Sequence, residues 1–267
     1  MTAPDDLNLP DGVTASDLKE GTQEFLEVID RIIREIGDQP DVTAKTANEG
    51  RVRVIAAFAN EALNAAESTA LLIRNELTLD ACTSARRAFE HALYAAWICS
   101  DRGSVEAFIQ EKGARWSLKM AKTLRKADVE IDLDEEMLAE VEQTVPSRKS
   151  RSEAADEVDS VEKVCDAFNP RLYVAYRWLC TTAHPSAHTV ARHYLISEGK
   201  GDTVGLQGGD EYLAAHTAAA SAVWAGRALD RFDLGQRRKQ ALKREARKLN
   251  ISPVLHLGMP HEGRWPI

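Results

Sequence analysis

The sequence predicts an all-α protein, a multi-helix bundle of about seven to nine helices with no significant sheet. Three observations lead to this class. Glycine (15) and proline (9), the two residues that interrupt helices, are scarce among the 267 residues. Apolar residues recur at spacings of three and four along most of the chain, as on one face of a helix. We find no convincing stretch with the alternating pattern of a strand.

We expect three parts in the chain: a flexible N-terminal arm over residues 1–13, a helical bundle over 14–233, and a basic C-terminal helix with an irregular tail over 234–267. Within the bundle, a first helix is capped by Thr14 or Ser16 and ends near Gly37. The further expected helices cover residues 42–76, 79–100, 104–126, 134–144, 161–168, 170–183 and 210–232.

Four details of this assignment rest on particular residues. Residues 92–99 are apolar all round, which marks 79–100 as the central helix. Gly50 leaves open whether residues 42–76 form one helix or two. The polar stretch 146–160 is expected to be an exposed loop with at most a helical turn. Residues 199–210 are expected to form a glycine-rich loop, which lacks the Gly-Lys-Ser/Thr ending of a phosphate-binding loop.

Composition indicates a cytoplasmic protein. No apolar run approaches the roughly 20 residues that a membrane-spanning helix needs, and the acidic N-terminus lacks the features of a secretory signal. The four cysteines form no CxxC pair and read as small buried apolar residues. They are Cys82, Cys99, Cys165 and Cys180.

Charge is unevenly distributed along the chain. The formal net charge is −8, yet residues 234–250 carry seven basic residues and one acid, Glu245, for a local net charge of +6. The remainder of the chain is therefore at −14. We expect RNA or another nucleic acid to be the partner of this basic helix; the alternative is a solvated face beside the acidic body. A homodimer is left open.

A row of polar residues interrupts the central helix. Arg86 and Glu90 share one face, and Arg87 and His91 share the adjoining one. Buried charges have to be paired, so we expect an ion pair of Glu90 with Arg86 or Arg87. Such a pair either serves packing alone or lines a pocket.

A second polar group follows a nearly apolar helix, in the stretch RLYVAYRWLCTTAHPSAHTVARHYL over residues 171–195. His184 and His188 are four residues apart, and Pro185 between them should end or kink the helix. A zinc site would need a third ligand that the spacing does not identify. We therefore predict no metal and no cofactor.

Two resemblances follow from these stretches. The combination of RRAFEHALYAAW with the later YRWLCTTAHPSAH resembles a family of uncharacterised bacterial all-helical proteins, over roughly residues 45–230. It implies a domain of unknown function whose shared positions are Arg87, Glu90, Tyr176, His184, Pro185 and Ser186. The spacings Arg86-x4-His91 and Arg177-x6-His184 are also similar to those in metal-independent ribonucleases of the higher-eukaryote-and-prokaryote nucleotide-binding helical superfamily. In those ribonucleases a small polar residue directly follows the Arg. In this sequence Arg87 follows Arg86, and Trp178 follows Arg177.

We therefore expect a pocket between the central helix and the His184 segment. The function that we expect for it is related to nucleic acids, such as metal-independent RNA cleavage in a defence or toxin setting. Histidine suits acid–base work near neutral pH, and arginine offsets phosphate charge. The alternative is a non-enzymatic binding module whose polar cluster is structural. The expected catalytic residues are Arg87, Glu90, His184 and His188, and the expected binding residues are Arg86, Tyr176, Arg177, Ser186 and Arg192.

Overall fold

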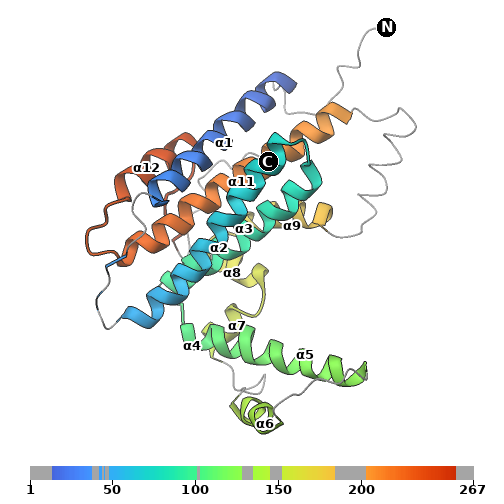
Figure 1. The fold of residues 1–267 in the computed structure, drawn as a ribbon, viewed down its shortest axis with the longest axis vertical. Helices are drawn as coiled ribbons and strands as arrows, with labels where there is room; N and C mark the ends of the chain where they lie inside the picture. Colours follow the sequence, from blue (N-terminus) through green and yellow to red (C-terminus); the bar gives the residue numbers. More distant parts are fainter. Residues whose placement is uncertain are drawn as a thin grey trace.

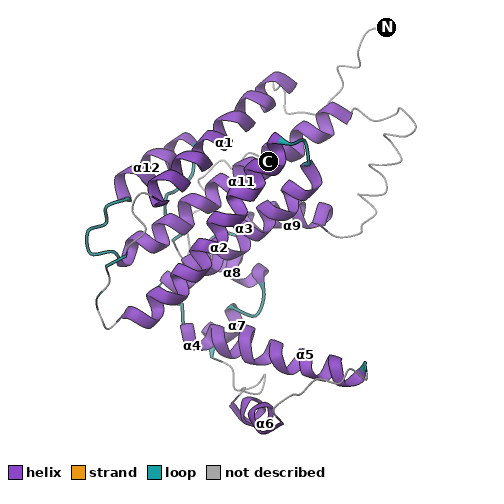
Figure 2. Ribbon diagram, viewed as in Figure 1, coloured by secondary structure: helices purple, strands orange, loops and turns teal. Residues whose placement is uncertain are grey.

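The computed structural model describes residues 14–37, 42–43, 45, 48–100, 103–127, 135–144, 152–183 and 203–256. All regular elements in these residues are helices (Figure 2), so the predicted all-α class is confirmed. The helices are α1 (Ala15–Gly37), α2 (Glu49–Arg74), α3 (Thr78–Cys99), α4 (Val105–Phe108), a π-helical turn (Ile109–Ala114), α5 (Arg115–Lys126), α6 (Glu135–Thr144), α7 (Glu153–Glu157), α8 (Val161–Phe168), α9 (Arg171–Ala183), α11 (Thr203–Phe232) and α12 (Lys239–Lys248).

Helix α3 lies at the centre of the bundle, in contact with α2, α11, α9 and α8 (Figure 1). Its residues Phe89, Leu93, Trp97 and Ile98 are all fully buried, as the apolar stretch 92–99 predicted. Small side chains fill the interfaces with its two long neighbours and let the helix axes approach closely. These are Ala81, Ala85, Ala88 and Ala92 of α3, Ala59, Ala62 and Ala66 of α2, and Ala215, Ala218 and Ala222 of α11, each completely buried.

Hydrogen bonds from Arg51 hold the backbone at the C-terminal end of α3, where the chain leaves the bundle. Arg51 of α2 donates from Nε to the carbonyl of Ile98 at 2.7 Å, and from Nη2 to those of Ser100 at 2.5 Å and Gly103 at 3.1 Å. It thus satisfies carbonyls that a helix end leaves unpaired. A Cβ atom on Gly103 would lie 1.9 Å from the Trp97 carbonyl oxygen, so only glycine fits this close approach. From here, α4, the π turn, α5 and α6 extend away from the bundle (Figure 1).

Three sequence expectations need correction or completion. The predicted loop over 199–210 is wrong from Thr203 onward, because α11 starts there; a helical glycine costs only about 1 kcal/mol, which the long Ala-rich helix behind it outweighs. Helix α2 is undivided, since Gly50 lies in its first turn. The stretch 146–160 contains α7, capped by Ser152, and buries Ala155 and Val158 instead of being fully exposed. The domain boundaries at 13 and 233 remain predictions.

One buried histidine joins three parts of the bundle. The His216 ring of α11 packs edge-on against Phe25 of α1, with ring centroids 5.0 Å apart. Its Nε2 lies 3.3 Å from the carbonyl oxygen of Leu249, the residue that follows the last turn of α12. Burial disfavours the imidazolium and lowers the pKa of His216 from 6.5 to about 4, although the Leu249 carbonyl partly opposes this.

We expect His216 to make the bundle less stable in mild acid. Below pH 6.5 the unfolded chain protonates this histidine, while the folded chain stays neutral down to about pH 4. The free energy of unfolding should fall across this window, by about 3 kcal/mol at its acid end. Urea unfolding at several pH values should show a shallower fall for His216→Gln. The control His91→Gln, on the bundle surface, should keep the wild-type pH dependence; equal curves for all three proteins would contradict this account.

Candidate functional site

The centre of the candidate site is an ion pair on α3 that meets a tyrosine of α9. Arg86 and Glu90 are one turn apart, and Nε and Nη2 of Arg86 each lie 3.0 Å from Oε1 of Glu90. Nη2 also donates to the Tyr176 hydroxyl at 3.1 Å, and the guanidinium lies over the Tyr176 ring, 5.2 Å from its centroid. Both charged side chains keep some exposure, 22% for Arg86 and 28% for Glu90. The cluster therefore borders solvent at the α3–α9 contact.

The cluster holds its members in definite protonation states. Burial disfavours the charge of Arg86, but the Glu90 carboxylate and Tyr176 hydroxyl outweigh it and raise its pKa. Burial, followed by the negative charge of Glu90, raises the pKa of Tyr176, and Arg86 only partly opposes this. Arg86 is accordingly a fixed cation, and the Tyr176 hydroxyl keeps its proton for donation.

The polar row continues along α3 to Tyr94, four residues beyond Glu90. Burial, followed by the charge of Glu90, raises the pKa of Tyr94. Lys112 of the π turn lies over the Tyr94 ring, 5.4 Å from its centroid, and donates to the Asp159 carbonyl at 2.8 Å. Burial lowers the pKa of Lys112, while the charges of Asp159 and Glu90 oppose the change. The polar row on α3 thus begins at Arg86 and ends at Tyr94, where Lys112 of the π turn covers it.

Sequence reasoning missed Tyr94 and Lys112. Tyr94 could have been found, because it follows Arg86 and Glu90 at the same spacing of four. Lys112 could not, since only the π turn and the packing of α7 and α8 bring it to α3. The same region contains the fully buried Glu111, which accepts hydrogen bonds from Nε and Nη2 of Arg115 at 2.7 and 3.1 Å.

The structure separates the two arginines that precede Glu90. Arg86 forms the ion pair with Glu90, whereas Arg87 is exposed and pairs with Glu61 of α2. The Arg87 carbonyl lies 2.7 Å from Nδ1 of His91, whose ring packs beside Phe58. Arg87 therefore belongs to the α2 side of α3, away from the contact with α9.

The remaining predicted site residues lie on or beyond α9. Arg177 is exposed on that helix, next to Tyr176. His184, Ser186, His188 and Arg192 lie outside the described residues, since the described part of α9 ends at Ala183. The expected meeting of Glu90 with His184 is accordingly a prediction that the structure leaves untested.

The basic C-terminal helix is partly neutralised by two neighbouring acids. It buries Leu242, Ala246 and Leu249 against the bundle and contacts α1 and α11. The buried Glu245 lies 3.0 Å from each of three cations, and the buried Asp233 lies 3.4 and 3.7 Å from two more. The cations are Arg31, Arg244 and Lys248 at Glu245, and Arg237 and Arg238 at Asp233. Four of the seven predicted basic residues of 234–250 thus have acids beside them, which leaves less charge for a phosphate backbone.

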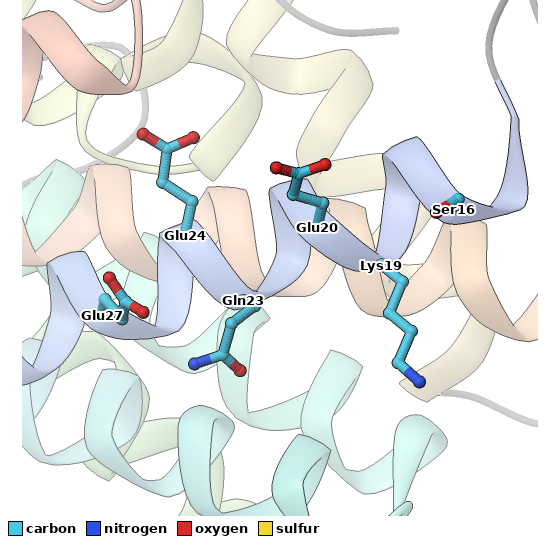
Figure 3. A pocket seen from close by; sticks show the side chains of 6 residues that line it. All are labelled: Ser16, Lys19, Glu20, Gln23, Glu24 and Glu27. Atoms are coloured by element: carbon cyan, nitrogen blue, oxygen red, sulfur yellow. The ribbon is translucent and has the colours of Figure 1, made fainter.

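Hollows on the described surface include two beside α1, and neither of these two contains a predicted site residue. The first, of about 630 Å³, lies on the outer face of α1, where the Glu20 and Glu24 carboxylates point to the same side (Figure 3). The second, of about 610 Å³, lies between α1, the end of α2 and α11, with Leu18, Leu26 and Ile73 in its wall. Both are open to solvent.

Metal-binding clusters and membrane-spanning helices are both absent from the described residues. These residues contain no group of three or more His, Cys, Asp or Glu side chains placed to hold a metal ion. None of their helices is long and apolar enough to cross a membrane.

Neutralising Glu245 should destabilise the protein. Burial opposes ionisation of Glu245, but hydrogen bonds from Lys248, Arg244 and Arg31 outweigh it and hold its pKa below the usual value. Glu245→Gln leaves three cations around a neutral amide, and we expect the free energy of unfolding to fall by about 2–3 kcal/mol. Glu27→Gln removes a carboxylate 3.4 Å from the same Arg31, but at an exposed site; it should cost less than about 0.5 kcal/mol in urea unfolding. Equal losses would show that burial of Glu245 is unimportant.

A double-mutant cycle should detect the coupling between Arg86 and Glu90. We expect Arg86→Met and Glu90→Gln to couple by about 1 kcal/mol, because the pair is half-buried and Tyr176 orders it. The matched control is the exposed pair Glu49–Arg53 on α2, with the same spacing and a 2.6 Å contact. Its coupling should be about 0.3–0.5 kcal/mol. A coupling at Arg86–Glu90 no larger than that would mean that the cluster is not preorganised.

Comparisons with known proteins identify the chain only at the level of its family. Residues 52–202, more than half of the chain, match the sequence profile described as "Family of unknown function (DUF5677)". Comparisons with curated proteins and with solved structures found no match. The matched range contains Arg86, Glu90, Tyr176 and His184, which confirms the predicted resemblance to a family of uncharacterised helical proteins. The chain belongs to the DUF5677 family of unknown function.

Proposed function

We propose that the protein cleaves RNA without a metal ion, at a site formed by the Arg86–Glu90–Tyr176 cluster and the histidine-rich segment that follows α9. The observation that carries this proposal is the contact between Arg86 and Tyr176. It anchors α9, the helix that precedes His184 in the sequence, on the face of α3 that carries the partly exposed Glu90 carboxylate.

The proposed chemistry needs two proton carriers and compensation of phosphate charge. One imidazole, of His184 or His188, removes the proton of a ribose 2′-hydroxyl, whose oxygen attacks the adjacent phosphorus. The bond from phosphorus to the 5′-oxygen breaks, and the other imidazole, in its protonated form, donates a proton to this leaving oxygen. The products are a 2′,3′-cyclic phosphate and a 5′-hydroxyl, and each histidine ends in the state in which the other began.

Other residues act through position and charge. Glu90 holds the Arg86 guanidinium in place, and Arg86 in turn fixes the Tyr176 hydroxyl as a donor. The exposed Arg177, together with Ser186 and Arg192, would contact phosphate oxygens. Arg87 faces α2 and pairs with Glu61, so we leave it out of the site. Cleavage of cellular RNA in the cytoplasm would give the protein a toxin-like role.

The test is cleavage of a labelled RNA oligonucleotide by the purified protein in the presence of EDTA. We expect a 2′,3′-cyclic product from the wild type, and rates at least 100-fold lower for His184→Ala and for His188→Ala. Glu90→Gln should lower the rate about tenfold, because it loosens Arg86 without removing a proton carrier. Arg87→Ala is the matched control, an arginine in the same turn of α3 that faces α2 and pairs with Glu61, and it should keep the wild-type rate.

Three outcomes would overturn the proposal. They are no cleavage by the wild type, equal rates for the wild type and His184→Ala, and activity that disappears when EDTA is added. The first would leave the cluster as a structural feature of a binding module.

A further inference from the structure

We infer that α5 carries a binding surface for single-stranded RNA, which would hold the substrate of the site proposed above. The inference rests on that proposed function for the identity of the nucleic acid. It starts from charge: residues 112–126 contain six basic residues and no acid, in a chain with a net charge of −8. The six are Lys112, Arg115, Lys119, Lys122, Arg125 and Lys126.

The cations of α5 are only partly neutralised by acids. Arg115 is held by the buried Glu111, and Lys122 lies 3.3 Å from Glu142 of α6 in a pair that is about two-thirds exposed. Lys119 and Lys126 are exposed and form no ion pair with another described residue. In α12, Arg244 and Lys248 likewise pair with the buried Glu245, but no large apolar side chain is exposed on that helix. Positive charge is therefore available on α5.

Large apolar side chains are exposed beside these lysines. Trp116 is 59% exposed and Met120 is 38% exposed, one helical turn apart, and Ile109 of the π turn is 55% exposed. An exposed indole next to cations is the combination with which proteins bind single strands: bases stack on the ring, and the cations attract the phosphates. The bases of a duplex are stacked inside the helix and are less accessible for such stacking.

The extent of the apolar face favours RNA over a lipid surface. A helix that lies in a membrane interface presents a continuous apolar face along its length. Along the π turn and α5 the exposed large apolar residues are Ile109, Trp116 and Met120, and the apolar face ends there, because the polar Thr123 follows one turn later and Lys126 after it. One aromatic ring flanked by lysines suits a few nucleotides better than acyl chains.

The position of α5 connects this surface to the proposed site. Lys112 directly precedes α5 through the π turn, and its ammonium lies over Tyr94, in the row on α3 that contains Glu90. Helix α5 extends from this point away from the bundle (Figure 1). A strand bound along α5 could therefore continue past Lys112 toward Glu90 and Tyr176.

The test measures binding separately from cleavage. Fluorescence anisotropy of a labelled 12-nucleotide uridine strand would be followed with full-length His184→Ala protein in EDTA. On this background we expect Trp116→Ala to raise the Kd at least tenfold, and Trp116→Phe to restore part of the affinity through stacking. Lys119→Glu/Lys126→Glu should also raise the Kd at least tenfold, and should lower the slope of log Kd against log salt by about 1.4, the value for two phosphate contacts on a single strand.

The matched control is Lys19→Glu/Arg34→Glu, which makes the same charge change at two exposed cations of α1 and should shift the Kd less than threefold. Circular dichroism should show unchanged folding for all variants, since the altered side chains are exposed. Binding that is lost in the α5 variants supports the surface even if the wild type never cleaves RNA, an outcome that would overturn only the proposed cleavage.

Several results would overturn the surface itself. One is unchanged RNA affinity in Trp116→Ala. A second is loss of affinity in Lys243→Glu/Arg247→Glu of α12 but not in the α5 variants. A third is Trp116-dependent sedimentation with phosphatidylserine vesicles in the absence of RNA binding, which would assign α5 to a membrane. A fourth is concentration-dependent self-association in ultracentrifugation that Trp116→Ala abolishes, without RNA binding, which would make α5 a contact between copies of the chain.

Discussion

Close packing of alanine faces determines the geometry of this protein. The buried alanines of α3 lie against those of α2 and α11, and this contact fixes the rotation of α3 about its own axis. Once two sides of α3 are occupied in this way, Arg86 and Glu90 must face the remaining side, and Tyr94 lies at its border, beside Phe58 of α2 and Phe108 of α4. That side is covered by α9 and, near its end, by the π turn. The polar row therefore depends on the smallest side chains of the bundle.

The treatment of charge divides the molecule into two kinds of basic segment. In α12 the cations surround buried carboxylates, which must be ionised and paired to be tolerated inside the protein. The basic character of that helix is thus part of its attachment to the bundle. In α5 the cations lie on an exposed helix beside an exposed tryptophan. Local net charge does not distinguish these two cases, since each helix has a buried carboxylate beside it; the exposed Trp116 of α5 does.

The fold was largely predictable because helical periodicity is a local property. The central helix, its all-round burial and the Ser104 cap of α4 followed from spacing and side-chain chemistry. The start of α11 did not, because the two glycines Gly208 and Gly209 are unfavourable locally and are accepted only within a long helix. The π turn leaves no comparable signal in the sequence, and it changes which side chains face the bundle.

The site was predictable only in part, for a related reason. A carboxylate four residues from an arginine indicates an ion pair, but Arg86 and Arg87 differ by about 100° around the helix. Only packing reveals that Arg86 faces Tyr176 and Arg87 faces Glu61. Lys112 and Asp159 meet through contacts between segments far apart in the sequence, which periodicity cannot predict.

Gly103 has a consequence for the whole extended part of the protein. Its α-carbon hydrogen occupies space directly against the Trp97 carbonyl, and Arg51 binds its own carbonyl. The direction in which the α4–α5–α6 arm leaves the bundle thus depends on a peptide unit that tolerates no side chain, together with the contacts of Lys112 with Tyr94 and Asp159. Because a small rotation at Gly103 is amplified along the length of the arm, a substitution there would move the tip of the arm much farther than the residue itself.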